Sequence, residues 1–228
     1  MSLRQKPRRP SGGVRKPSRL TRERIIEAGL GLVDREGSDA ISMRRLSDAL
    51  GVTPMALYNH VSSKRDLLRA VAEHVLGKVR FDGGHRDWRV QIEFCFHTLR
   101  AICLRHPGMV RLLEEADVAP AAAFLPMEIA LRALGQAGFD NRDALRAYFT
   151  LVSFTLHQTS YQSRGPFPDL EPSEKIRAER LAGRGYDAIE RLSTTADWDF
   201  DAAFEFGLAL ILGGVEAMAK ARKRRRSS

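Results

Sequence analysis

Residues 41–68 read ISMRRLSDALGVTPMALYNHVSSKRDLL, and the fold follows from this segment. Its pattern predicts two short helices joined at Gly51, followed by the start of a third. Ser42 is placed to cap the first helix, because a serine hydroxyl accepts a hydrogen bond from a free amide of the first turn. Gly51 follows the last apolar residue, where helices commonly end in a left-handed turn. Helix, tight turn and helix within about 20 residues is the helix-turn-helix pattern.

The second of these helices is expected from Pro54 to His60, with Thr53 as its cap. Proline is well tolerated at the first helical position, where the missing N–H would have no partner. On a helical wheel, Leu57 and Val61 share one face and would point into a core. The opposite face carries small or hydrogen-bonding side chains and no acid: Met55, Ala56 and Asn59.

This outward face suits the major groove of DNA, which is about 12 Å wide and admits an α-helix. Asn59 can make a bidentate contact to adenine, and Met55 or Ala56 can touch a thymine methyl group. Tyr58 and Lys64 suit phosphate oxygens, because a phenol and an ammonium group both donate hydrogen bonds. The sequence therefore predicts a DNA-reading helix.

The run 20–68 resembles the DNA-binding domain of the Tet repressor (TetR) family. The specific signal is LYNHV at 57–61 followed by SSKRDLL at 62–68, with RIIEA at 24–28 and LGV at 50–52 in support. The resemblance implies that Tyr58, His60 and Lys64 lie on the DNA backbone. It also implies that the following residues face bases or phosphates: Arg44, Thr53, Met55, Ala56 and Asn59. Ser42 completes the predicted DNA-binding set.

Positive charge is concentrated at the two ends of the chain. Residues 1–22 hold eight Lys or Arg, and 219–228 hold six, which leaves −5 of the net +9 for the segment between. Residues 1–19 are rich in proline, so we expect a disordered basic arm that enters the minor groove or follows the DNA backbone, with Arg15 and Lys16 as contacts. A solvated arm that only aids solubility is the alternative. Residues 222–228 are expected to form a basic tail.

Composition indicates a folded, cytoplasmic protein of one or two domains. Of the 228 residues, 43% are apolar and 29% are charged, which allows both a core and a solvated surface. The apolar runs are shorter than the 18 or so residues of a membrane span, so we expect no membrane partner. Cys95 and Cys103 are too few for a disulfide framework and are expected to be buried thiols.

The remainder of the chain also follows helical periodicity, so the predicted class is all-α. We expect a three-helix helix-turn-helix DNA-binding domain over 20–80, including a linking helix at 64–79. A larger helical ligand-binding and dimerisation domain should span 86–221. Its helices are expected from Asp87 onward, at 119–137 with a bend at Pro126, at 140–163 and at 199–221. Glycines in the last helix favour close helix packing, either within one subunit or in a four-helix dimer interface.

No constellation of side chains suggests an enzyme. The sequence has neither a glycine-rich phosphate loop nor a nucleophile elbow. Glu93, His97 and His106 lack the close spacing of a zinc site. We therefore expect no catalytic residue, no cofactor and no metal.

A candidate ligand site lies on the 140–163 helix. One stripe of this helix mixes aromatic and hydrogen-bonding side chains, as ligand pockets do, although a core or a dimer seam would look similar: Thr150, Phe154, His157 and Tyr161. LRALGQAGF at 131–139 also resembles the tetracycline-repressor branch of the family. That resemblance implies that Pro107 is a pocket residue and that His106 replaces a pocket arginine. Ile102 and Ser153 stand where that branch has histidines around a drug-bound magnesium, which argues against a magnesium-chelated tetracycline.

Together with these features, the resemblance to the TetR family implies a homodimeric repressor that binds a palindromic, double-stranded operator and is released by a small-molecule effector. The alternative is a DNA-binding protein that needs no ligand, or an architectural one, held on DNA by its basic ends.

Overall fold

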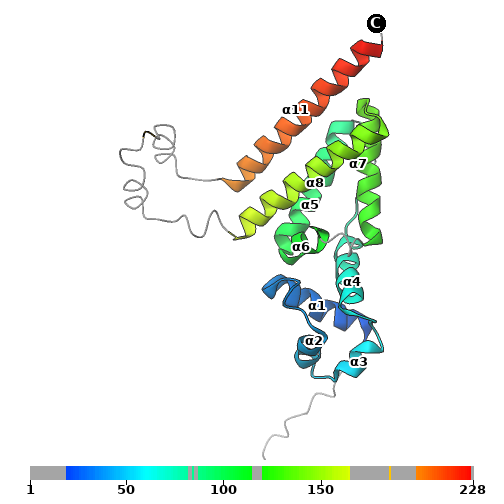
Figure 1. The fold of residues 1–228 in the computed structure, drawn as a ribbon, viewed down its shortest axis with the longest axis vertical. Coiled ribbons are helices and arrows are strands. Elements are labelled where there is room, and N and C mark those ends of the chain that lie inside the picture. Colours follow the sequence, from blue (N-terminus) through cyan, green and yellow to red (C-terminus); the bar gives the residue numbers. More distant parts are fainter. Residues whose placement is uncertain are drawn as a thin grey trace, which may run out of the picture.

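The computed structural model describes residues 19–81, 84, 87–114, 120–164, 185 and 199–226, and all regular structure in these segments is helical (Figure 1). The all-α class is confirmed. Helices α1 to α3 lie at one end of the molecule, α4 connects them to the body, and α5 to α8 with α11 form that body (Figure 1). In chain order the elements are α1 (Arg22–Glu36), α2 (Met43–Leu50), α3 (Pro54–Tyr58), α4 (Lys64–Leu76), α5 (Trp88–Arg105), α6 (Gly108–Glu114), the 3-10 helix η2 (Ala121–Ala123), α7 (Phe124–Ala137), α8 (Asn141–Arg164) and α11 (Phe200–Arg226).

Side-chain caps begin each of the first four helices. The hydroxyl groups of Thr21 and Thr53 accept hydrogen bonds of 3.3 Å from backbone amides of the first turns of α1 and α3. Ser42 and Ser63 accept hydrogen bonds of 3.1 Å at the starts of α2 and α4. Gly51 ends α2 with φ 66°, a left-handed conformation that a residue with a Cβ adopts only with strain. Local sequence thus places the helix-turn-helix.

Two helices of this region are shorter than expected. α3 ends at Tyr58 instead of His60, because the amides of His60 and Val61 both bond to the Leu57 carbonyl and tighten the last turn. α4 ends at Leu76 instead of residue 79, where Gly77 follows it.

The expected bend at Pro126 is wrong. The 3-10 helix η2 precedes α7, and Pro126 lies in the first turn of α7, where amides have no partner within the helix and proline is tolerated.

The expected basic tail at 222–228 is not a separate segment, because α11 continues to Arg226. Arg222 explains the extension: its guanidinium group forms ion pairs with Asp140 and Asp143 and lies over the ring of Phe139. The end of α11 and the helix-turn-helix are at opposite ends of the molecule (Figure 1).

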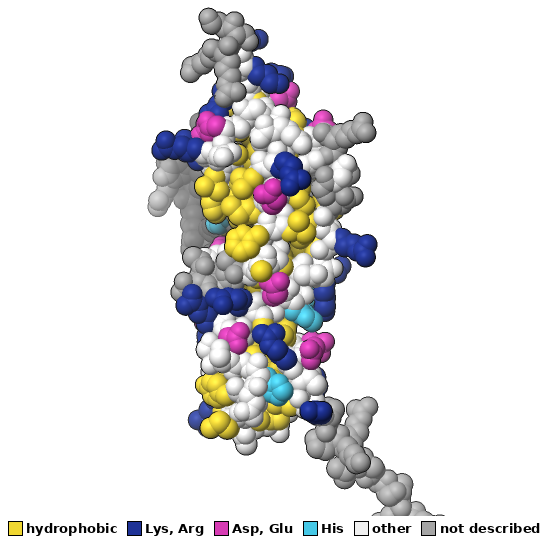
Figure 2. Space-filling model, turned by 90° about the vertical axis from the view of Figure 1, so that its right-hand side faces the viewer, with side chains coloured by type: hydrophobic (Ala, Val, Ile, Leu, Met, Phe, Trp, Pro, Cys, Tyr) yellow, Lys and Arg dark blue, Asp and Glu magenta, His cyan; other side chains and the backbone are white. Residues whose placement is uncertain are grey.

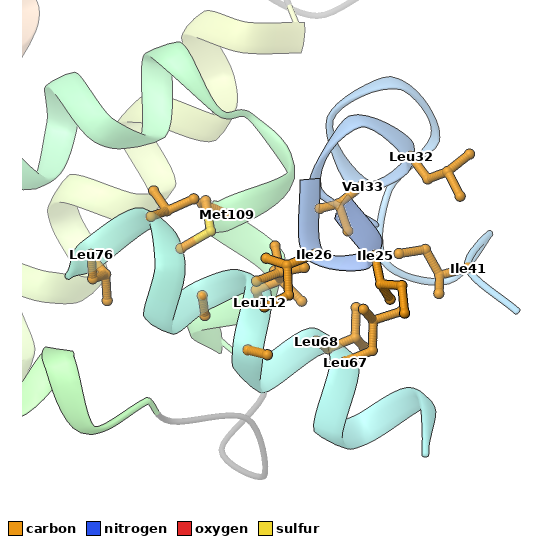
Figure 3. Packing of buried hydrophobic residues seen from close by; sticks show 14 of the residues in the cluster. Ile25, Ile26, Leu32, Val33, Ile41, Leu67, Leu68, Leu76, Met109 and Leu112 are labelled. Atoms are coloured by element: carbon orange, nitrogen blue, oxygen red, sulfur yellow. The ribbon is translucent and has the colours of Figure 1, made fainter. Parts of the chain in front are cut away.

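Two hydrophobic clusters hold the molecule together. The first joins the helix-turn-helix domain to the body: Ile25 and Leu67 belong to the same cluster as Met109 and Leu112 of α6 (Figure 3). α1 and α6 approach so closely that a Cβ at Gly108 would overlap both the side chain and the carbonyl of Val33. The two expected domains therefore share one core.

The second cluster lies between α5, α7, α8 and α11, and includes Phe96, Leu134, Leu151 and Phe204. α11 packs along α8 (Figure 1). By length and composition, Phe200–Arg224 could cross a membrane: its most apolar window has a mean hydropathy of 1.6, and 28% of that window is buried. The rest of this apolar surface is open in the single chain.

Candidate DNA-binding surface and effector cavity

α3 presents the two faces that its sequence predicts. Leu57 is fully buried and Val61 is 1% exposed, and both pack into the first cluster. Met55 is 73% exposed, Asn59 is exposed and Ala56 is half-buried. The outward face of α3, formed by Met55, Ala56 and Asn59, is therefore accessible and carries no acidic side chain.

Residues on both sides of α3 complete this surface. Tyr58 is 49% exposed, Arg44 is exposed and His60 is half-buried. Ser42 uses its hydroxyl oxygen to cap α2, which leaves its O–H free to donate. The Lys64 ammonium group donates to the Asp39 carbonyl at 3.4 Å, which holds this cation beside the turn before α2. Arg15 and Lys16 lie outside the described residues.

Asp66 fixes the turn between α3 and α4. Its carboxylate accepts hydrogen bonds from the Ser62 amide at 2.9 Å and the Ser62 hydroxyl at 3.2 Å. These bonds, the backbone bond first, hold the pKa of Asp66 below its ordinary value, with Arg22 contributing a nearby positive charge. An ionised Asp66 therefore keeps α3 in register with α4.

The body contains an apolar cavity of about 250 Å³ between α4, α5, η2, α7 and α8. Its wall includes Leu76 at the end of α4, and Tyr148, Phe149, Val152 and Leu156 on one side of α8. Leu76 belongs to α4, so the helix that joins the helix-turn-helix to the body also forms part of the cavity wall. Nothing in the helical stripe that we predicted for ligand binding reaches this wall.

One residue of that stripe, Phe154, packs against α11, whereas Thr150 and His157 are exposed. Phe154 stacks on Phe204 with ring centroids 5.4 Å apart, and the rings of His157 and Tyr161 are 4.8 Å apart. The Thr150 hydroxyl donates to the Arg146 carbonyl at 2.9 Å, a bond within α8. Phe154 thus packs between helices of the body, while ligand binding by the other three residues stays a prediction.

His106 and Pro107 also lie away from the cavity. The His106 Nδ1 is 2.9 Å from the Asp34 carboxylate of α1, so this side chain connects the body to the DNA-binding domain. Pro107 lines a hollow on the surface between α1 and α6. The sequence did contain a signal for the wall of this cavity, namely the aromatic pair Tyr148 and Phe149 followed by apolar residues one and two turns later.

Both cysteines are buried free thiols, as expected. Burial raises the pKa of Cys95 to about 11 and that of Cys103 to about 12, and the charge of Glu114 adds to the shift at Cys103. Such thiols are unreactive near neutral pH. Among the described residues, no group of three or more His, Cys, Asp or Glu side chains could hold a metal ion.

A capped helix-turn-helix with an exposed outward face, attached through α4 to a helical body, defines the class: a DNA-binding transcription regulator. The profile of bacterial regulatory proteins of the tetR family matches residues 25–71, and that of the tetracyclin repressor-like C-terminal domain matches residues 56–219. The chain belongs to the TetR family of transcriptional regulators. Proteins of this family are regulators and not enzymes.

Relatives match over nearly the whole chain. An HTH-type transcriptional regulator of Saccharopolyspora erythraea is 31% identical, over 92% of this chain and 91% of its own. Tetracycline repressor protein class C of Escherichia coli is 32% identical, over 88% and 93%.

Solved structures agree with this assignment. ActR of Streptomyces coelicolor in complex with actinorhodin has a TM-score of 0.70 and 28% identity, covering 89% of this chain and 99% of ActR. BioQ with its double-stranded DNA operator has a TM-score of 0.63 and 26% identity, covering 87% and 99%.

Proposed function

We propose that the protein is a homodimeric repressor that binds a palindromic operator through α3 and is released when a small molecule enters the apolar cavity. The observation that carries this proposal is the exposed face of α3 joined, through one continuous core and α4, to a cavity wall. Operator binding by BioQ and actinorhodin binding by ActR support the same two activities in this chain.

Dimerisation would cover the open side of α8 and α11. Phe206, Leu210 and Met218 are 68%, 61% and 53% exposed on α11, and Leu145 is 39% exposed on α8. Side chains of this size are rarely left together in water. A second copy packed twofold against them would form a four-helix bundle. The same dimer would cover the apolar stretch of α11 with protein instead of lipid. The charged residues at the two ends of α11 would then stay in water.

Two subunits are needed for specificity, because α3 is only one and a half turns long. A twofold dimer presents two such helices to half-sites about one DNA turn, or 34–36 Å, apart. The operator should therefore be a palindrome with a fixed spacing.

Release needs a physical link between the cavity and α3, and α4 provides it. Leu76 at its end lines the cavity, and its Glu73 carboxylate accepts a hydrogen bond of 2.9 Å from the Ala122 amide of η2, which borders the cavity. A ligand that displaces η2 or Leu76 would tilt α4. The tilt would change the separation of the two reading helices in the dimer.

An unbiased selection of bound DNA from random duplexes tests the proposal. We expect a palindrome whose half-sites are one turn apart, preferred over random DNA by roughly 10³-fold or more. Bound DNA with no common sequence would instead support the architectural alternative. A palindrome that no small molecule releases would support a repressor that acts without a ligand.

A further inference from the structure

We infer that the effector is an uncharged, largely aromatic molecule that stacks in the apolar cavity and hydrogen-bonds to the Tyr148 hydroxyl group. This inference rests on the proposed function, since it assigns a chemical class to the ligand of the same site. Three properties of the described cavity wall carry it: the absence of charge, the arrangement of rings, and a single phenol with no hydrogen-bond partner there.

Charge is absent from the described residues that line the cavity, which include no Asp, Glu, Lys, Arg or His. The groups there that could ionise are Cys95 and Tyr148. Burial raises the pKa of Cys95 to about 11 and also raises the pKa of Tyr148, so both are neutral near pH 7. An ionised ligand would lose its hydration in this cavity without meeting an opposite charge on the described part of the wall, which is strongly unfavourable. The ligand is therefore neutral.

Aromatic rings surround the cavity. The rings of Phe96 and Tyr148 have centroids 6.2 Å apart, and those of Tyr148 and Phe149 are 5.4 Å apart and edge-to-face. Phe81 and Phe124 belong to the same wall. The rings of each pair touch one another, so a flat ring would lie beside them and meet the faces and edges that line the cavity. An aromatic ligand gains more from this wall than an aliphatic one of equal area.

Tyr148 supplies the polar anchor. Its side chain is partly buried, and its hydroxyl group makes no hydrogen bond to another described residue. The hydroxyl group is not fully buried, so water can reach it, and a carbonyl or hydroxyl oxygen on the ligand would take the place of that water. The single anchor would orient a ligand that otherwise binds by stacking.

The cavity has an opening through which such a molecule can enter. Phe124 and Phe149 line the cavity and are also 63% and 54% exposed, so they belong to both the wall and the surface. Hydrophobic side chains gather on the face of the body that Figure 2 shows. In the single chain, these two rings mark where an apolar ligand would reach the cavity.

Two dyes with the same ring system test whether the cavity prefers an uncharged ligand. N-phenyl-1-naphthylamine is uncharged, and 8-anilinonaphthalene-1-sulfonate adds one sulfonate. We would titrate the full-length protein with each and follow dye fluorescence. We expect the neutral dye to bind at least about tenfold more tightly. Equal binding, or tighter binding of the sulfonate, would overturn the inference.

Two variants on α7 locate the bound dye. Met127 lines the cavity, whereas its neighbour Glu128 has a side chain that is 61% exposed and pairs with Arg132 on the surface. Met127→Trp should fill the cavity and weaken binding of the neutral dye about tenfold or more, while the matched control Glu128→Trp should not. Circular dichroism and thermal unfolding of both variants show that they fold, whether or not a filled cavity also weakens operator binding. Equal dye affinity in the two variants would place the dye elsewhere and contradict the inference.

Tyr148→Phe tests the anchor, because it removes one oxygen and keeps the ring. Flavone is neutral and flat and carries a carbonyl acceptor, and its affinity can be measured by displacement of the dye. We expect the variant to bind flavone about three- to tenfold more weakly and the dye with unchanged affinity. An unchanged affinity for flavone would contradict the role of Tyr148.

Operator release is measured separately, by anisotropy of labelled DNA. Selective binding of the neutral dye without release would support the ligand class and contradict the release mechanism in the proposed function. Release by the sulfonate dye alone would support a ligand-controlled repressor and overturn the uncharged class.

Discussion

Asn59 and Tyr58 are adjacent at the end of α3, but we expect them to bind different parts of the DNA. Asn59→Ala should relax the preference for one base pair by about 1–3 kcal/mol, because the amide is the group that distinguishes adenine. Tyr58→Phe is the matched control: it should weaken binding to all sequences alike, since its hydroxyl donates to phosphate. The measurement is competition binding against single-base variants of the selected site. A uniform loss with Asn59→Ala would remove that residue from base reading.

Asp66 makes stability depend on pH. Its pKa is lower in the folded protein than the ordinary 3.8, so its contribution is fully present above that value and is lost as the pH falls through the folded value. Asp66→Asn should therefore destabilise the protein at pH 7 and cause progressively less difference below about pH 4. Urea unfolding of both proteins across this range is the measurement. A difference that stays constant with pH would contradict the capping role.

At the scale of elements, the contact of α1 with α6 sets how the DNA-binding domain meets the body. Gly108→Ala should destabilise the protein by about 1–3 kcal/mol, because the new methyl group would overlap Val33. Gly135→Ala is the control: its Cβ would meet no atom within 4 Å, and alanine favours the helix by up to about 1 kcal/mol. Thermal unfolding measures both. Equal stability of Gly108→Ala and the wild type would show that α1 and α6 can separate at little cost.

The hydrogen bond from η2 to α4 should affect the release of the operator by ligand more than it affects operator binding itself. Glu73→Ala removes the acceptor of the Ala122 amide. We expect operator affinity without ligand to change little, and the concentration of N-phenyl-1-naphthylamine needed for release to change a few-fold, since one exposed hydrogen bond contributes about 1 kcal/mol or less. Anisotropy of labelled operator measures both quantities. Glu128→Ala, on the exposed side of α7, is the control, and an identical response of the two variants would remove Glu73 from the link.

At the scale of the whole molecule, the two basic ends should behave differently. The chain enters the DNA-binding domain directly after residues 1–19, whereas α11 ends at the opposite end of the molecule (Figure 1). Deletion of 1–19 should reduce the slope of log affinity against log salt, by about 0.9 for each phosphate that the arm neutralises in the full-length protein. Deletion of 223–228 should leave the slope unchanged. A smaller slope after the second deletion would show that the end of α11 reaches DNA.

The elements that depend on local interactions could be predicted from the sequence alone. The caps at Ser42 and Thr53, the left-handed Gly51 and the two faces of α3 all involve groups within a few residues of one another, so their pattern is readable along the chain. The all-α class followed for the same reason.

The side of α8 that lines a cavity could not be predicted in this way, because it depends on tertiary packing. Thr150 and Phe154 on one side, and Tyr148 and Val152 on the other, have the same helical spacing, and the choice depends on where α5, α7 and α11 pack. The extension of α11 likewise depends on Arg222 meeting Asp140 and Asp143, about 80 residues earlier in the chain. Such contacts join distant segments, so periodicity within one helix cannot reveal them.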